Sequence, residues 1–174
     1  MNILIINGSH RVNGNCERFS EVARNILSND NAVRVVNLID MNIKYCTGCL
    51  NCEEGIECSI NDDFSKIIEP ELKAADLIIF ATPTYFNLPS AVMINFLDRT
   101  NKLCEYFSDN AKKSMFYLVG QTDEESIREA YKCLHTYSEI MNMEEIEEPI
   151  VQVARMPESV SEETKKRLYG LFSK

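Results

Sequence analysis

Short, continuously apolar runs recur along the chain, and each is followed by a segment with helical periodicity. The apolar runs lie at 3–6, 32–38, 76–82 and 114–120, and a fifth strand is expected within 146–154. The expected helices lie at 14–28, about 62–75, about 90–107, 123–142 and 161–172. Because the runs are apolar throughout instead of alternating, both faces of their sheet should be covered by helices. The sequence therefore predicts an α/β protein with a parallel sheet between two helical layers.

The order of these elements leaves few possible topologies, because crossover connections between parallel strands are right-handed. A flavodoxin-like, doubly wound, five-stranded parallel sheet in the order 2-1-3-4-5 fits best. We expect a single domain over residues 1–174, with a cysteine-rich insertion loop at about 45–60. Pro70 should break or kink the second helix. Ser90, Asp123 and Ser161 stand where the N-caps of three later helices are expected.

The charge balance excludes some classes of partner. The formal net charge is −9, and the basic residues are scattered, so we expect neither nucleic-acid binding nor docking on an anionic membrane. No apolar run is long enough to span a bilayer, and the first residues lack the basic region and cleavage site of a signal peptide. These features predict a cytoplasmic protein, in which a structural disulfide framework is not expected.

Three unusual loops should meet where a doubly wound sheet binds its ligands, outside the carboxyl ends of its strands. The loop at 7–16 is rich in Gly, Ser and Asn and opens a helix, so it is either an anion site or a flexible turn. It matches neither the dinucleotide-binding nor the P-loop pattern. The loop at 82–90 holds two aromatics and two prolines, which either face a flat ring or pack on the core. The third loop begins at Gly120, where the backbone can approach a ligand closely.

With these loops, the chain resembles the flavodoxin-like NAD(P)H-dependent FMN reductase family. The phosphate-loop pattern G-S-x-R-x-x-G-N-S/T matches residues 8–16, the pattern P-x-Y-F/W matches 83–86, and a hydrophobic-Asp-Arg motif matches 97–99. The resemblance covers residues 1 to about 120 and is weaker beyond. Cys16 stands where the family usually has a hydroxyl, and because a thiol is a weaker donor, FMN should bind somewhat less tightly.

The resemblance implies an FMN-dependent oxidoreductase that uses NADH or NADPH and forms a homodimer or a higher homo-oligomer. It implies that the FMN phosphate is held by Ser9, Arg11, Asn13, Asn15 and Cys16. It implies that the isoalloxazine is lined by Pro83, Thr84, Tyr85, Phe86, Asn87, Gly120 and Gln121. No catalytic side chain is expected, because the flavin carries the chemistry and the protein positions it.

Residues 46–58 hold four of the seven cysteines with the spacing C-x2-C-x2-C-x5-C. The spacing differs from that of the bacterial ferredoxin run. A zinc site is less expected, because zinc usually takes two well-separated pairs of cysteines. A redox-active C-x-x-C pair is also less expected, because such a pair normally opens a helix. Zinc binding and free thiols remain alternatives. The motif resembles that of the iron–sulfur flavoprotein branch of the family, down to the acidic pair at 62–63. This resemblance implies one 4Fe–4S cluster, which relays electrons to or from FMN and is held by Cys46, Cys49, Cys52 and Cys58.

The sequence leaves the electron donor and acceptor open. A ferredoxin-like redox protein could replace the nicotinamide, which would make the chain an electron-transfer flavoprotein. A non-catalytic flavin- or redox-sensing module is the remaining alternative. Cys16, Cys104 and Cys133 are interpreted as small buried hydrophobic residues.

Overall fold

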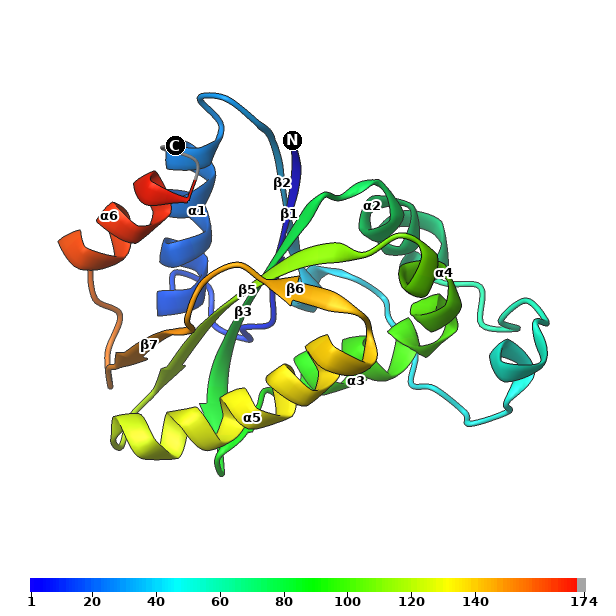
Figure 1. The fold of residues 1–174 in the computed structure, drawn as a ribbon. Helices are drawn as coiled ribbons and strands as arrows, with labels where there is room; N and C mark the ends of the chain where they lie inside the picture. Colours follow the sequence, from blue (N-terminus) through cyan, green and yellow to red (C-terminus); the bar gives the residue numbers. More distant parts are fainter. Residues whose placement is uncertain (172–174) are drawn as a thin grey trace.

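The computed structural model describes residues 1–171 as a mostly parallel sheet with helices on both faces (Figure 1). The strands are β1 (Asn2–Asn7), β2 (Ala32–Asn37), β3 (Leu77–Tyr85), β4 (Leu88–Pro89), β5 (Lys112–Gly120), β6 (Met143–Glu145) and β7 (Ile150–Val153). The α-helices are α1 (Asn15–Leu27), α2 (Glu69–Ala74), α3 (Ala91–Arg99), α4 (Cys104–Asp109), α5 (Glu124–Ile140) and α6 (Glu162–Gly170).

The strand order confirms the predicted flavodoxin-like topology. β2, β1, β3 and β5 lie side by side, and β6 and β7 both pair with β5. The run at 146–154 supplies β7, which pairs with the second half of β5, whereas β6 pairs with its first residues. The other added strand, β4, is a two-residue antiparallel partner of β3.

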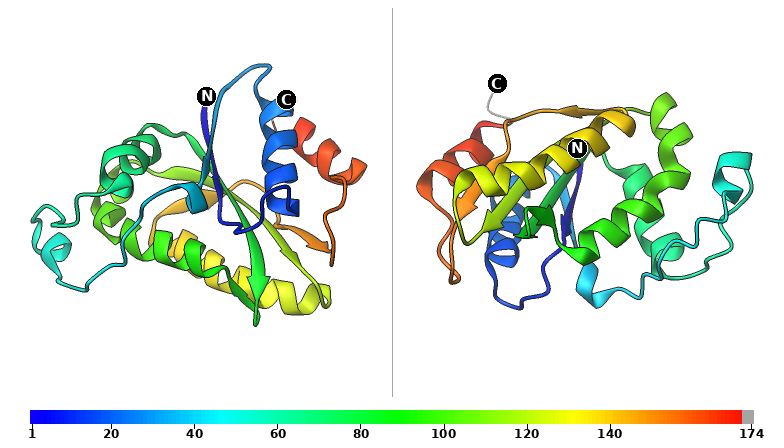
Figure 2. Two further views of the ribbon diagram at one scale, coloured as in Figure 1. Left: turned by 180° about the vertical axis from the view of Figure 1, so that it is seen from behind. Right: turned by 90° about the horizontal axis from the view of Figure 1, so that it is seen from below.

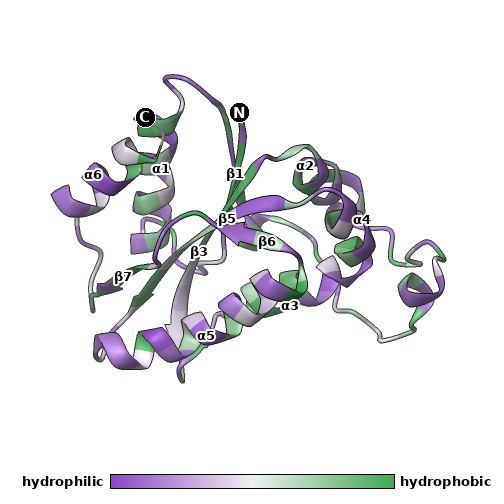
Figure 3. Ribbon diagram, in the orientation of Figure 1, coloured by the Kyte–Doolittle hydropathy of each residue, from purple (hydrophilic) through white to green (hydrophobic). Residues whose placement is uncertain are grey.

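Each face of the sheet packs against its own hydrophobic core. On one face, α1 and α6 lie side by side and cover Ile3, Ile5 and Ile79 (Figure 2). On the other face, α3, α4 and α5 cover Leu4 and Phe80. Because successive strand residues point to opposite faces, a strand buried on both must be apolar throughout. Figure 3 shows β1 hydrophobic along most of its length for this reason.

The predicted caps are present, but two helices differ from the prediction. Ser90 accepts a hydrogen bond from the N–H of Met93, and Asp123 and Ser161 cap α5 and α6 in the same way. The helix expected at 62–75 begins as a π-helical turn at Phe64–Ile68 and becomes α-helical only at Glu69. Pro70 lies in the first turn of α2, where its missing N–H is tolerated.

The helix expected at 90–107 is divided into α3, a 3-10 turn at Thr100–Leu103 and α4. At the end of the chain, position 172 of the expected last helix lies outside the described residues. No helix within residues 1–171 is both long and apolar enough to cross a membrane.

The cysteine segment projects away from the sheet, to the side of α4 (Figure 1, cyan). Its only turn of helix is a 3-10 turn at Asn51–Glu54, in a region where most side chains are exposed. Leu50 and Gly55 flank this turn with left-handed φ angles of 63° and 72°. For Leu50 this conformation is uncommon, because its Cβ disfavours it.

Candidate functional site

The loops that follow β1, β3 and β5 come together at one edge of the sheet, around a small hollow of about 40 Å³. We call it the flavin-side hollow, after the flavin expected there from the sequence. Twelve residues line it: Ser9, Arg11, Gly14, Asn15, Cys16, Pro83, Thr84, Tyr85, Val119, Gly120, Gln121 and Ala154. The hollow lies outside the carboxyl ends of the parallel strands, which is where doubly wound sheets bind ligands.

Hydrogen bonds between the loops fix the shape of this edge. The N–H of Gly8 donates to the carbonyl of Ala81 at 2.8 Å. The hydroxyl of Ser90 donates to the carbonyl of Gly8 at 2.6 Å, and the N–H of Ser90 donates to the hydroxyl of Thr82 at 3.2 Å. These hydrogen bonds hold the first two loops together.

The first loop folds on its own side chains and presents the start of α1 to the hollow. Asn7 Oδ1 accepts the N–H of Ser9 at 3.0 Å, and Ser9 Oγ accepts the N–H of Arg11 at 3.0 Å. The N-cap of α1 is Gly14, which lacks a side chain to cap the helix. The N–H groups of the first turn have no partner within the helix, so they are available to bind an anion. A Cβ on Gly14 would lie 3.1 Å from the Cβ of Arg11, so a side chain at this position would crowd the first loop.

Four of the five residues expected to hold a phosphate line the hollow, and one does not. Ser9, Arg11, Asn15 and Cys16 line the hollow, whereas Asn13 does not. The amide of Asn15 is engaged elsewhere: it donates to the carbonyl of position 156 at 3.2 Å and accepts an N–H from position 158 at 2.7 Å. Asn13 has a φ of 58°, and its N–H donates to a carboxylate oxygen of Glu17.

Cys16 is buried, and burial raises the pKa of its thiol well above the usual value. The thiol is therefore protonated at neutral pH. It can act as a weak hydrogen-bond donor but not as a nucleophile.

The second and third loops contribute part of the predicted ring site. Thr84 and Tyr85 line the hollow, while Phe86 and Asn87 form the tip of the β3–β4 hairpin and do not. Phe86 is 99% exposed. Gly120 is required by packing, because a Cβ there would lie 2.5 Å from the hydroxyl of Thr84.

Three lining residues were missed from the sequence: Gly14, Val119 and Ala154. Ala154 follows β7, whose carboxyl end reaches the same edge of the sheet. The strand predicted within 146–154 could have indicated Ala154, because its carboxyl end lies at the edge of the sheet where ligands bind.

A second and larger hollow, of about 670 Å³, lies beside the cysteine segment. All four cysteines of the motif line it, together with apolar side chains such as Leu97 and Ile140 from α3 and α5. Cys104 and Cys133 also line it, and they are half-buried instead of buried as expected from the sequence. Burial raises the pKa of both thiols.

The four thiols of the motif share a hollow but do not converge on one point. Among the described residues, no group of three or more Cys, His, Asp or Glu side chains is placed to hold a metal ion. Cys46 and Cys49 are exposed, while Cys52 and Cys58 are half-buried. Asn101 donates to the sulfur of Cys52 at 3.6 Å. The four soft sulfur ligands suit iron chemically, and a cluster would require the segment to close around it.

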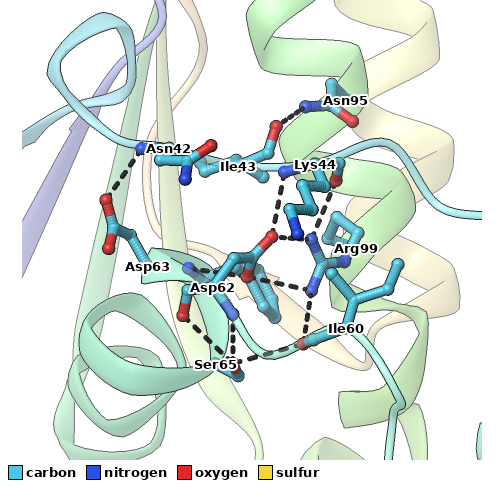
Figure 4. Close-up of polar contacts among 10 residues, drawn as sticks. Asn42, Ile43, Lys44, Ile60, Asp62, Asp63, Ser65, Asn95 and Arg99 are labelled. Atoms are coloured by element: carbon cyan, nitrogen blue, oxygen red, sulfur yellow. Dashed lines mark hydrogen bonds and ion pairs between the residues drawn. The ribbon is translucent and has the colours of Figure 1, made fainter.

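The two ends of the cysteine segment meet at a buried ion pair between Arg99 and Asp62 (Figure 4). Burial alone would raise the pKa of Asp62. The hydrogen bonds from Arg99 and Lys44 and the charge of Arg99 outweigh that effect, so the pKa of Asp62 lies below its usual value. In the sequence the two partners belong to separate features: Asp62 to the acidic pair at 62–63 and Arg99 to the motif at 97–99.

The chain is similar in sequence to several known proteins. Residues 1–157 match the family described as NADPH-dependent FMN reductase. An iron-sulfur flavoprotein of Archaeoglobus fulgidus is 33% identical over 100 residues, which cover 58% of this chain and 49% of that protein. An iron-sulfur flavoprotein of Methanocaldococcus jannaschii is 28% identical over 144 residues, which cover 82% of this chain and 74% of that protein. The chain thus spans about half the length of the first relative and about three quarters of the second.

A solved structure shows the same fold. The crystal structure of the flavodoxin, WrbA-like protein from Agrobacterium tumefaciens superimposes with a TM-score of 0.63 at 18% identity. The superposition covers 98% of this chain and 92% of that one.

Proposed function

The chain belongs to the NADPH-dependent FMN reductase family, and on this premise we propose that it is an FMN-dependent oxidoreductase. The observation that carries the proposal is the flavin-side hollow. There the uncapped start of α1, the cation of Arg11 and the Thr84–Tyr85 turn line one cavity at the carboxyl ends of the strands.

In this proposal the phosphate of FMN lies at the start of α1. Backbone N–H groups after Gly14 donate to it, and the Arg11 guanidinium adds a charge-assisted contact. The ring would be lined by Pro83, Thr84 and Tyr85 and by the Gly120–Gln121 turn, which lies beside them in the sheet. Because Gly120 has no Cβ, the backbone there can approach the ring closely.

Bound FMN would supply hydride and single-electron chemistry, and the protein's part is to bind and orient it. The titratable side chains that line the hollow are Arg11, Cys16 and Tyr85. Burial raises the pKa of Cys16 and keeps its thiol protonated, so it does not suit the role of a general base. We propose no proton-transfer residue, because the flavin itself carries the chemistry.

We further propose that Cys46, Cys49, Cys52 and Cys58 hold one 4Fe–4S cluster that relays electrons between FMN and a one-electron partner. Two observations support this part of the proposal. All four cysteines line the same hollow, and relatives of the chain are named iron-sulfur flavoproteins. The segment is largely exposed, so it can close around a cluster without unpacking a core.

NADH or NADPH is the proposed electron donor, with a ferredoxin-like protein as the alternative. A homodimer is proposed because large apolar side chains stand exposed near the flavin-side hollow, among them Val12, Phe86, Leu88 and Met156. We also propose a cytoplasmic location, where thiols are kept reduced.

FMN titration tests the first part of the proposal. Purified protein should be yellow or should quench the fluorescence of added FMN with one equivalent per chain. Anaerobic addition of NADH or NADPH should then bleach the flavin. Slow bleaching with nicotinamide but fast bleaching with a reduced ferredoxin would indicate electron transfer, and bleaching by neither would indicate a sensor. Protein that takes up no FMN would exclude all three.

Iron analysis tests the second part. Protein isolated or reconstituted without oxygen should contain about four irons and four sulfides per chain and give a paramagnetic signal after reduction. Iron-free protein with four titratable thiols in the segment would exclude the cluster.

A further inference from the structure

Arg99 contacts both ends of the cysteine segment with one side chain (Figure 4). It is the last residue of α3, and its Nη1 donates to the carbonyl of Lys44 at 2.8 Å. Its Nη2 donates to the carbonyl of Ile60 at 3.5 Å. Lys44 lies two positions before the first cysteine of the motif, and Ile60 lies two positions after the last.

Asp62 completes this arrangement, which we call the clasp: Arg99, Asp62 and the backbone of Lys44 and Ile60. The carboxylate accepts two hydrogen bonds from the guanidinium, at 2.6 and 3.2 Å. It also accepts the N–H of Lys44 at 2.9 Å and the N–H of Phe64 at 3.1 Å. The side chains of Arg99 and Asp62 are 2% and 0% exposed.

Stability is a poor explanation for such a pair. Taking two charges out of water costs about as much as their attraction returns, and apolar replacements are often neutral or stabilising. What the pair offers instead is geometry, because the two guanidinium nitrogens each bond one carboxylate oxygen and so fix the orientation of the two groups relative to each other. The clasp therefore sets the positions of Lys44 and Ile60 relative to each other and to the end of α3.

Between these fixed ends, the cysteine segment has few ties to the rest of the protein. Side-chain contacts join Asn101 to the sulfur of Cys52 at 3.6 Å and Lys102 to the exposed carboxylate of Glu57 at 3.5 Å. Arg99 also lies close to Cys58. The segment is thus closed at its base and loose at its tip. Bringing the two ends of a loop together costs conformational entropy. Because the clasp already holds the ends together in the folded protein, cluster binding does not have to supply this free energy.

We propose that the clasp is a positioning device for the cluster ligands: by holding both ends of the segment, it brings Cys46 and Cys58 within reach of one iron–sulfur cube. This inference rests on the cluster part of the proposed function. Arg99 and Asp62 are positioning residues in it and do not ligate iron. Outer partners of this kind typically change metal affinity 10- to 100-fold when they are altered.

The test compares Arg99→Lys with Arg128→Lys after anaerobic reconstitution. Arg99→Lys keeps the charge but loses the fork, whereas Arg128→Lys makes the same exchange in an exposed ion pair on α5. Iron loss to a ferrous chelator should be roughly 10- to 100-fold faster in Arg99→Lys and unchanged in Arg128→Lys. The paramagnetic signal of the reduced cluster should also change in Arg99→Lys, because Arg99 lies beside Cys58.

A double variant, Arg99→Met with Asp62→Asn, guards against simple unfolding. It leaves no buried charge unpaired, so its unfolding temperature and FMN binding should stay near those of the unmodified protein while iron is lost faster. Unchanged iron loss and an unchanged signal in both variants would overturn the inference. A parallel loss of FMN would also overturn it, because the pair would then support the whole fold. If the unmodified protein assembles no cluster, the clasp proposal and the cluster proposal both fall, whereas FMN binding still tests the flavin proposal separately.

Discussion

Arg11 provides the sharpest test of the flavin site, because its proposed partner can be removed from the ligand. The side chain lines the flavin-side hollow beside the uncapped start of α1. If it contacts the phosphate, Arg11→Ala should weaken the binding of FMN. It should leave the binding of riboflavin, which has the same ring and no phosphate, unchanged.

The size of the effect follows from the exposure of the side chain. A hydrogen bond to a charged group contributes about 1.5–3 kcal/mol. Arg11 is exposed, and the backbone N–H groups of α1 remain available to the phosphate, so we expect the lower end of that range. At about 1.4 kcal/mol for each factor of ten, the Kd for FMN should rise about tenfold.

Fluorescence-quenching titrations with both ligands, at one ionic strength, measure this difference. Arg24→Ala is the matched control, because it removes the same charge from the exposed far end of α1. Equal weakening of FMN and riboflavin by Arg11→Ala would refute the reasoning, since a phosphate contact cannot affect a ligand without phosphate. An equal effect of Arg24→Ala would show that only net charge matters.

Four further outcomes are expected. Gly120→Ala should weaken FMN binding in the same titration, because its new Cβ would meet a side-chain oxygen at 2.5 Å. Cys16 should escape a thiol reagent in the native protein and react only after unfolding, since burial raises its pKa. The hydrogen bond to Glu145 raises the pKa of His135. The interaction should therefore stabilise the fold fully below about pH 6.5, and this stabilisation should be lost as the pH rises through the raised pKa. Unfolding curves of His135→Asn across that range should lack this pH dependence. Phe86→Asp should shift the proposed dimer toward monomer in sedimentation.

Much of the fold was predictable because burial on both faces of a sheet leaves a direct mark on the sequence. Residues 3–6 are apolar without interruption, and all four are at most 2% exposed. Caps are equally local, and Ser90 and Asp123 cap the helices that were expected of them. The π-helical turn before Pro70 was not predictable in its form, since a proline signals an interruption but not which hydrogen-bond pattern replaces the α-helix.

The candidate site was predictable as a set of loops but not as a set of contacts. Sheet topology alone brings the loops after β1, β3 and β5 to one edge, so the position of the hollow could be expected. The side chain of Asn15 shows the limit. Its amide bonds to positions 156 and 158, more than 140 residues away, and no local pattern records such a contact. The spacing of the cysteines likewise specifies four possible ligands, but the positions of their sulfurs depend on how a mostly exposed segment closes.

The two proposed cofactor sites are joined by one rigid element. α3 begins next to Ser90, whose hydroxyl bonds to the first flavin loop, and it ends at Arg99 in the clasp. Nine helical residues rise about 13 Å, so the helix sets the spacing between the flavin loops and the base of the cysteine segment. Because α3 packs on the sheet through Met93 and Phe96, that spacing does not depend on the exposed segment itself. A cluster that assembles in the segment would therefore be placed relative to FMN by the folded core, with the clasp as the link between the two.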